Sequence, residues 1–454
     1  MAVPPRSRGT VLAKARSSYA ARRLLLPAQR FVHAETISGM VLLAAAVLAL
    51  GWSNSPWSRS YEAVWNLPVS LHAGPVHISH ALREWINDAL MVVFFFVVGL
   101  EVKREFVHGS LSQWRRAALP IICALGGMLV PAALYAALNH GTTAARGWGI
   151  PMATDIAFAL GILALAGDRV PASVRMLLLA IATADDIGAI IVIAVFYSEQ
   201  ISIAALLASV LLVAIMLAMR WGGIQSLMAY VPFAVLFWFA VHESGIHATI
   251  AGVVLGLITP TSPSTDTFSF VASAQRLLSD IRHAGSPHEV GRVEAILGEL
   301  EELTVATESP ADRLIRLLQP WSGYFVLPIF AVANAGVTLT AEIGRQAFWS
   351  PATRGVALGL VVGKVAGIGL FAFVAVRLRI ASLLPNTRWA YMIAIGLLGG
   401  IGFTVSLFIT DLAFTEPTAT AQAKLGVLAA SVISGVAGYL VLRSAAMQPA
   451  RVLE

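Results

Sequence analysis

Two stretches decide the fold of this chain: Met152-Ala-Thr-Asp-Ile-Ala-Phe-Ala-Leu-Gly161 and Leu177-Leu-Leu-Ala-Ile-Ala-Thr-Ala-Asp-Asp-Ile-Gly-Ala-Ile-Ile191. They place Asp155, Asp185 and Asp186 inside apolar segments long enough to cross a bilayer. A charge at the membrane centre costs about 2.5–3.5 kcal/mol on insertion scales, so a helix without these carboxylates would serve anchoring better. We therefore expect them to bind and release protons, cations or both.

The composition is typical of a multi-span membrane protein. Of 454 residues, 57% are hydrophobic and 12% are charged, whereas soluble domains average about 25% charged residues. The net charge of +6 lies mainly in loops and tails, which favours contact with membrane lipid and argues against nucleic acid as a partner. Cys123 is the single cysteine, so an intramolecular disulfide and a cysteine-rich metal site are excluded. We expect no cofactor.

The apolar runs predict an all-α bundle of about twelve transmembrane helices. The predicted spans are 36–54, 84–102, 117–138, 149–166, 172–198, 201–220, 226–242, 245–260, 318–338, 355–378, 388–412 and 421–443. They form one transmembrane domain over 35–443, between a basic tail over 1–34 and a short tail over 444–454. Lys and Arg are concentrated in the loops on the side of the basic tail, which places both termini in the cytoplasm. An organelle transit segment is the alternative interpretation of residues 1–34.

Two long loops interrupt this pattern. Residues 261–312 are polar and charged, and we interpret them as a cytoplasmic insertion with one helix near Val290–Leu303. The loop Asn54–Arg83 alternates apolar and polar residues around Val76 and Ile78 and predicts an exterior hairpin, a contact at which the chain would form a homodimer.

Two spans are interrupted at membrane depth. Pro151 precedes Asp155 in one span, and the other carries Gly396, Gly399, Gly400 and Gly402. Broken backbone is tolerated there only where it lines an enclosed or hydrated cavity. The half-helix ends favour a carboxylate at N-termini and a cation at C-termini, roles open to Asp155 and Lys364. Each broken span is the second in a set of three, 117–198 and 355–443, which is the topology of an inverted repeat.

Asp185 and Asp186 are neighbours, so on a helix they project about 100° apart. One faces a cavity in this interpretation while the other meets Lys364. Two carboxylates this close titrate as a coupled pair. With hydroxyl or backbone oxygens they make a hard-oxygen site suited to a small cation and to competing protons.

Eight motifs, in order, resemble the NhaA-type sodium/proton antiporter family over about residues 30–445. They are Trp85-Ile-Asn-Asp-Ala-Leu-Met, Gly99-Leu-Glu-Val-Lys-Arg-Glu105, Ala153-Thr-Asp-Ile-Ala-Phe-Ala, Asp185-Asp-Ile-Gly-Ala-Ile, Gly245-Ile-His-Ala-Thr-Ile-Ala-Gly252, Phe330-Ala-Val-Ala-Asn-Ala-Gly336, Gly363-Lys364 and Gly400-Ile-Gly-Phe-Thr404. The resemblance implies electrogenic exchange of Na+, or the similar Li+, for protons at a bacterial inner membrane, in sodium and pH homeostasis.

The resemblance also implies residue roles. Asp185 and Asp186 would bind Na+ and protons competitively, and Lys364 would form an ion pair with the site. Thr154 and Asp155 would stabilise the crossing of the broken helices. A pH response would involve Glu101, Arg104, Glu105 and His247. A further acidic position of the family aligns with Ile315, which, with the insertion 261–312, departs from the family's usual pH-sensing pattern.

Other interpretations stay open at this point. Asp155 could only cap a helix break, His247 could be a histidine satisfied by backbone, and Lys364 could extend to the lipid interface, although it lies about ten residues inside its span. Two other functions also use intramembrane carboxylates. An intramembrane aspartyl protease would need aspartates facing each other from two glycine-rich helices, and a proton- or sodium-coupled solute symporter would need a cavity for an organic substrate.

Overall fold

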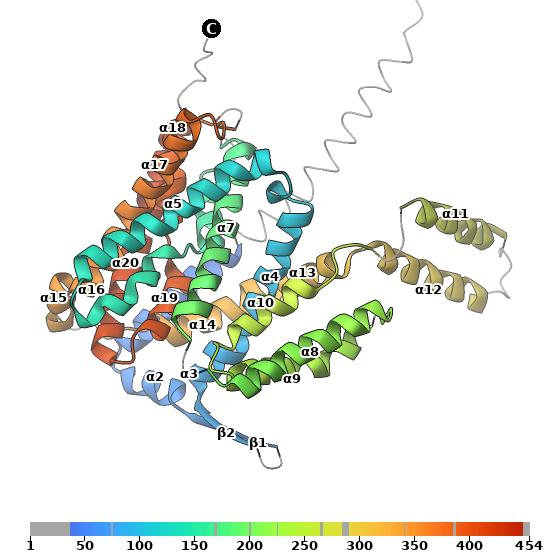
Figure 1. Ribbon diagram of the computed structural model, residues 1–454, viewed down its shortest axis with the longest axis horizontal. Helices are drawn as coiled ribbons and strands as arrows, with labels where there is room; N and C mark the ends of the chain where they lie inside the picture. The colour runs from blue at the N-terminus through green and yellow to red at the C-terminus, as the bar shows by residue number, and fades with distance from the viewer. Residues whose placement is uncertain are drawn as a thin grey trace, which may run out of the picture.

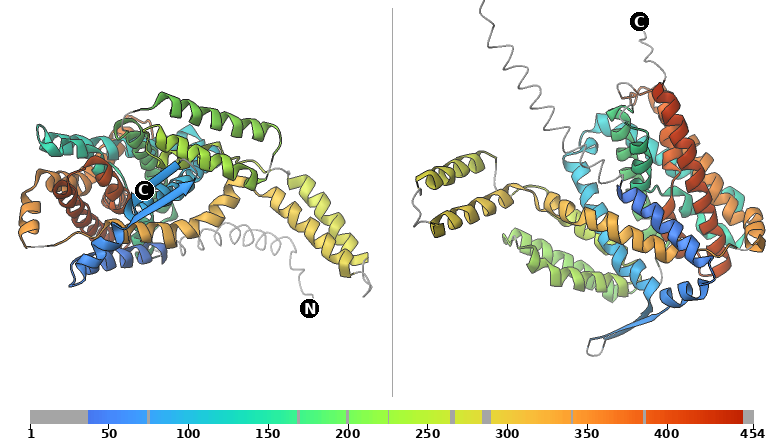
Figure 2. Two further views of the ribbon diagram at one scale, coloured as in Figure 1. Left: turned by 90° about the horizontal axis from the view of Figure 1, so that it is seen from below. Right: turned by 180° about the vertical axis from the view of Figure 1, so that it is seen from behind.

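The computed structural model describes residues 37–447 except 74–75, 168–169, 199–200, 225, 264–266, 284–289, 340 and 385–386. It is a bundle of helices with one β-hairpin at one end and a pair of helices, α11 (Thr267–His283) and α12 (Val290–Thr307), projecting from its side (Figures 1 and 2). The predicted tail 1–34 and the last seven residues lie outside the described residues.

Each of the twelve predicted stretches contains a helix. The elements are Ile37–Ser53, α3 and α4 (Leu82–Trp85 and Met91–Val107), α5 (Trp114–Asn139), a 3-10 helix η3 (Thr143–Met152) with α6 (Ile156–Leu165), α7 (Ala172–Phe196), α8 (Ile203–Trp221), α9 (Leu227–Glu243), α10 (Thr249–Ile258), α13 and α14 (Pro310–Trp321 and Leu327–Asn334), α16 and α17 (Pro351–Leu358 and Lys364–Arg377), α18 and α19 (Trp389–Gly399 and Phe403–Ala413), and α20 (Pro417–Met447).

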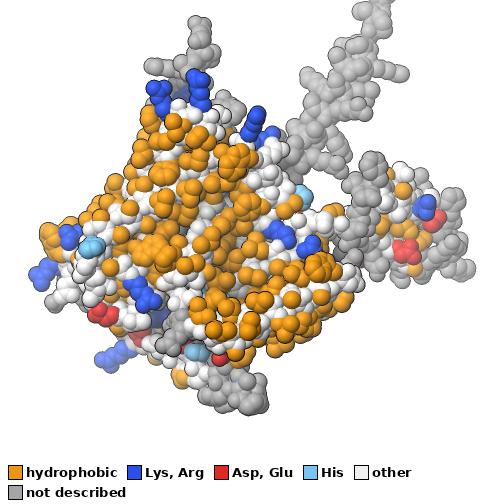
Figure 3. Space-filling model, in the orientation of Figure 1, with side chains coloured by type: hydrophobic (Ala, Val, Ile, Leu, Met, Phe, Trp, Pro, Cys, Tyr) orange, Lys and Arg blue, Asp and Glu red, His pale blue; other side chains and the backbone are white. Residues whose placement is uncertain are grey.

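By length and composition, seven of the described helices can cross a membrane, or up to ten if each bent pair counts as one span. The helices α9 and α10 are apolar but shorter. Hydrophobic side chains cover the face of the bundle seen in Figure 3, and Lys and Arg lie mainly towards its edges. This surface suits an environment of lipid chains, where helices satisfy their own backbone groups.

Three of the long helices contain a wide π-turn. These turns are Ile86–Leu90 between α3 and α4, Ser322–Val326 between α13 and α14, and Gly359–Gly363 between α16 and α17. The last of them ends directly before Lys364. Such turns add a residue to the helix and are frequent at functional sites.

The predicted hairpin is present. Strands β1 (Pro68–Ala73) and β2 (Val76–Ala81) are antiparallel, with Ser70 opposite Ser79. The loop before them also contains the short helix α2 (Ser58–Trp65), which the sequence did not predict. We call this end of the bundle the hairpin side.

The helix that contains the ninth predicted span starts earlier than that span. The helix begins at Pro310 rather than near 318, because the Ser309 hydroxyl accepts a hydrogen bond from Asp312 N at 3.1 Å and Pro310 occupies the first turn. The insertion also contains two helices, α11 (Thr267–His283) and α12 (Val290–Thr307), where one was predicted.

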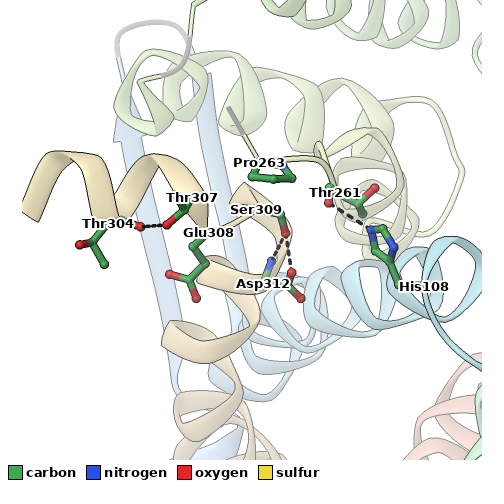
Figure 4. Close-up of a pocket in the computed structure, with 8 residues that line it drawn as sticks. All are labelled: His108, Thr261, Pro263, Thr304, Thr307, Glu308, Ser309 and Asp312. Atoms are coloured by element: carbon green, nitrogen blue, oxygen red, sulfur yellow. Dashed lines mark hydrogen bonds between the residues drawn. The ribbon is translucent and has the colours of Figure 1, made fainter. Parts of the chain in front are cut away.

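A polar cavity of about 610 Å³ lies where the insertion joins the bundle (Figure 4). His108, at the end of α4, lines it together with Thr261 and Asp312, and the His108 ring lies 3.3 Å from the Thr261 carbonyl oxygen. The insertion is therefore in contact with the end of α4 that carries Glu101, Arg104 and Glu105.

Glycine contacts bring α17 against α5. A Cβ added at Gly367 would lie 2.1 Å from the carbonyl oxygen of Gly126, and one at Gly363 would lie 2.9 Å from Pro131 Cα. Close packing is therefore the role of the Gly363 and Gly367 spacing. It fixes the backbone on both sides of Lys364.

Candidate functional site

The two broken helices cross at the centre of the bundle. The pair η3 and α6 bends by 48°, and the pair α18 and α19 bends by 45°. The two breaks touch, because Asp155 N donates a hydrogen bond to Ile401 O at 2.6 Å. The prediction of two broken, crossing helices is confirmed.

One carboxylate satisfies the N-terminal ends of both half-helices. Asp155 Oδ1 accepts from Phe158 N at 3.0 Å, at the start of α6. Its Oδ2 accepts from Thr404 N at 3.1 Å and from Thr404 Oγ1 at 2.7 Å, at the start of α19. Negative charge is stabilising at helix N-termini, so the sequence-based placement of Asp155 agrees with this geometry. Thr404 was not assigned a role, although the motif Gly400-Ile-Gly-Phe-Thr404 contains it.

The opposite half-helix ends meet a cation and a hydroxyl. Lys364 Nζ donates to the carbonyl oxygen of Met152, the last residue of η3, at 2.5 Å. Thr154 Oγ1 lies 2.9 Å from the carbonyl oxygen of Gly399, the last residue of α18, and 3.1 Å from Lys364 Nζ. Carbonyl oxygens that have no helical partner at these ends are thereby satisfied.

Lys364 also forms an ion pair with Asp185 Oδ2, and both side chains are fully buried. Thr154 Oγ1 lies 2.6 Å from the same oxygen. The other oxygen, Asp185 Oδ1, is buried and has no hydrogen-bond partner among the described residues. A buried acceptor is normally paired, so Asp185 has capacity for one more ligand.

Asp186 points elsewhere. It lies within electrostatic reach of Asp185, Asp155, Glu101 and Lys364, and its side chain is 7% exposed. The neighbouring aspartates thus have different surroundings, as their separation of about 100° on α7 requires. Asp185 pairs with Lys364, whereas Asp186 has no hydrogen bond or ion pair among the described residues. Among the described residues, no three His, Cys, Asp or Glu side chains are arranged to hold a metal ion.

The four residues predicted for a pH response do not form one cluster. His247 lies on the hairpin side, where its Nε2 is 3.5 Å from Asp88 Oδ1 and its Nδ1 is 2.9 Å from Thr249 Oγ1. Glu101, Arg104 and Glu105 lie near the other end of α4, about 20 Å away at 1.5 Å per residue.

Ile315 lies beside this second group. It is 3% exposed and packs with Leu100 and Ala311. The apolar contact joins α13 to α4 next to Glu101, at the position where the family resemblance implies an acidic residue.

Known proteins of one family are similar to this chain over most of its length. The profile of the family described as Na+/H+ antiporter 1 matches residues 29–442. The chain is 44% identical over 425 residues to the Na(+)/H(+) antiporter NhaA of Oleidesulfovibrio alaskensis, covering 93% of this chain and 94% of the relative. It is 45% identical over 423 residues to that of Acidithiobacillus ferrooxidans, covering 92% and 97%.

A solved structure has a similar fold. The structure of a sodium proton antiporter from Methanocaldococcus jannaschii superposes with a TM-score of 0.50 at 12% sequence identity, and the match covers 93% of this chain and 99% of that one.

Proposed function

This chain belongs to the Na+/H+ antiporter 1 family and exchanges Na+ for protons across a membrane, and from that premise we propose that Asp185 and Asp186 bind the two ions in turn. The assignment depends on one observation: Asp185 Oδ1 is buried and has no hydrogen-bond partner among the described residues, while Lys364 neutralises the other oxygen, Oδ2. The protein is a transporter and not an enzyme, so the intramembrane protease is set aside, and exchange of two inorganic ions requires no organic solute.

Exchange follows from competition for the same lone pairs. A cation that reaches Asp185 Oδ1 adds positive charge beside Lys364 and weakens its hold on Oδ2. Protonation of the aspartates removes the negative charge that holds the cation. If the site reorients only when it carries Na+ or protons, the two ions are exchanged obligatorily. More than one proton for each Na+ makes the exchange electrogenic.

In this proposal Thr154 and Asp155 hold the crossing in place. Both bind half-helix ends and both stand beside the site, so they position Asp185 and the backbone around it. Li+, which has the same charge and similar oxygen preference, is a second substrate of the site.

The test is the collapse of a pH gradient in everted vesicles on adding Na+, Li+ or K+ over a series of pH values. We expect Na+ and Li+ to collapse the gradient and K+ to have little effect. A gradient that none of the three cations collapses at any pH would contradict the proposed exchange.

The pH response is proposed to depend on Glu101, Arg104, Glu105 and His247, and on the insertion. Deleting residues 263–307 is expected to shift the pH dependence of exchange without stopping it, because α11 and α12 project from the side of the bundle (Figure 2) and the end of α12 meets α13 and the end of α4 at the polar cavity. The measurement is the same vesicle assay over pH. Loss of folded protein would instead make the insertion structural.

The chain is a multi-pass membrane protein with bacterial relatives. We propose the bacterial inner membrane as its location, with both termini in the cytoplasm and the hairpin outside, on the basis of the Lys and Arg distribution. A homodimer that forms through the hairpin stays a prediction.

A further inference from the structure

A second buried lysine–aspartate pair lies away from the central site. Asp411, near the end of α19, accepts from Lys424 of α20, with Nζ and Oδ1 2.7 Å apart. The two side chains are 18% and 8% exposed, respectively. Asp411 Oδ2 is buried and has no hydrogen-bond partner among the described residues.

This pair repeats the arrangement at the centre. In both pairs a lysine occupies one carboxylate oxygen and leaves the other oxygen buried without a hydrogen-bond partner among the described residues. A carboxylate oxygen in this state is a hard ligand that suits a small alkali cation. Asp411 differs from Asp185 in that its side chain is 18% exposed, whereas the Asp185 side chain is fully buried.

Asp411 lies on the same face of α19 as the residue that joins this helix to the central site. Thr404, Phe408 and Asp411 follow one another along one face of α19, since residues three or four apart share a helix face. Thr404 binds Asp155 at the centre. Phe408 packs against His247, with ring centroids 5.0 Å apart, on the hairpin side. Asp411 therefore lies farther towards the hairpin side than Phe408.

Phe408 lies between Thr404 and Asp411 along α19 and packs with two other buried phenylalanines. Its ring centroid is 5.5 Å from that of Phe95 and 6.3 Å from that of Phe330, and all three residues are at most 3% exposed. An ion that moved from the central site along this face of α19 would pass Phe408 before it reached Asp411. Beyond Phe408, Asp411 is a carboxylate on the same face of α19.

We propose that Asp411 is a second binding site for the transported alkali cation, used between the central site and the hairpin side, and that Lys424 competes with the cation for it. The proposal depends on Na+/H+ exchange but not on the roles given to Asp185 and Asp186. It assigns the two partners opposite effects. Asp411 attracts the cation, whereas Lys424 repels it and occupies the carboxylate.

A purely structural pair would behave differently. If Asp411 and Lys424 only tied α19 to α20, removing either partner would have the same effect, because each change breaks the same bond. A buried ion pair adds little net stability compared with an apolar pair. Opposite effects of the two substitutions therefore distinguish a binding site from a tether.

The experiment measures the apparent KM for Na+ separately from the two faces of the membrane, in right-side-out and everted vesicles. Asp411→Asn is expected to raise the KM from the hairpin side about tenfold, the loss typical of one contact to a charged group, and to change the KM from the other face less than about twofold. Lys424→Gln is expected to lower the KM from the hairpin side. Ser70→Cys, labelled with a membrane-impermeant thiol reagent, identifies the hairpin side.

Glu62→Gln is the matched control, because it breaks an exposed ion pair with Arg83 on the same side, and it should leave both KM values unchanged. Asp411→Glu keeps the charge, so its KM from the hairpin side should stay closer to that of the wild type. This variant can be measured even if Asp411→Asn does not fold. Equal changes at both faces, no change at either face, or a raised KM in both Asp411→Asn and Lys424→Gln would overturn the proposal. Absence of exchange in the unmodified protein would instead contradict the family activity.

Discussion

Asp185→Asn is expected to abolish Na+/H+ exchange while leaving a folded, membrane-inserted protein, and Asp186→Asn is expected to do the same. The amide has nearly the shape of the carboxylate, but it carries no charge and does not take up or release a proton near neutral pH. Attraction between unit charges about 4 Å apart is roughly 4 kcal/mol at an effective dielectric constant of about 20. Losing it lowers the affinity for the cation by up to about a thousandfold.

The geometry predicts different secondary effects for the two substitutions. Asp185→Asn leaves Lys364 without its anionic partner in a fully buried position, so this variant should also lose thermal stability. Asp186 has no hydrogen-bond or ion-pair partner among those identified in the described residues, so Asp186→Asn should keep the stability of the wild type. The loss for Asp185→Asn should be about 3–5 kcal/mol, which is the typical cost of removing one partner of a buried ion pair.

The measurements are the collapse of a pH gradient by Na+ and the midpoint of thermal unfolding of the purified protein. Asp280→Asn, on the exposed face of α11, is the control and should retain both activity and stability. Substantial exchange by either Asp185→Asn or Asp186→Asn would contradict the assigned mechanism.

Asp155→Ala is expected to destabilise the protein by about 3–5 kcal/mol, more than the loss of any single helix cap. A lost N-cap costs about 1 kcal/mol, and Asp155 caps both α6 and α19. The substitution also leaves Phe158 N, Thr404 N and the Thr404 hydroxyl without their acceptor, and an unsatisfied buried donor costs about 1–3 kcal/mol. Some of these donors will bind water instead, so the total loss of stability is smaller than the sum of the separate costs.

Ser309→Ala provides the comparison, because Ser309 caps only α13. Thermal unfolding should show a shift several times larger for Asp155→Ala than for Ser309→Ala. Asp155→Asn keeps one acceptor oxygen and should fall between them. Equal shifts for the two alanine variants would show that Asp155 does not hold the crossing together.

The sequence predicted the features that depend on local composition. Pro151 and the glycines of 396–402 predicted the two breaks, because both residue types destabilise the interior of a continuous helix. The depth of Lys364 in its span predicted a buried partner. The family resemblance supplied the residue roles, which local patterns alone left open.

Other features depend on contacts between distant parts of the chain. Thr404 and Asp155 are 249 residues apart, and no local pattern indicates that one carboxylate serves both helices. Asp411 and Lys424 are close in sequence but lie on different helices, so their pairing depends on how α19 and α20 pack. The start of α13 was misjudged because hydropathy does not detect a polar first turn that contains Asp312 and Arg313.

The shared cap at Asp155 has a mechanical consequence. Because a single side chain holds the first turns of α6 and α19, neither half-helix can tilt away from the other without breaking hydrogen bonds in an interior that offers few replacements. The crossing is therefore rigid. It moves as one unit when the site reorients between the two sides of the membrane. Any bending must then occur in other parts of the helices. Hinges for this bending are provided by the three wide π-turns, at Ile86–Leu90, Ser322–Val326 and Gly359–Gly363.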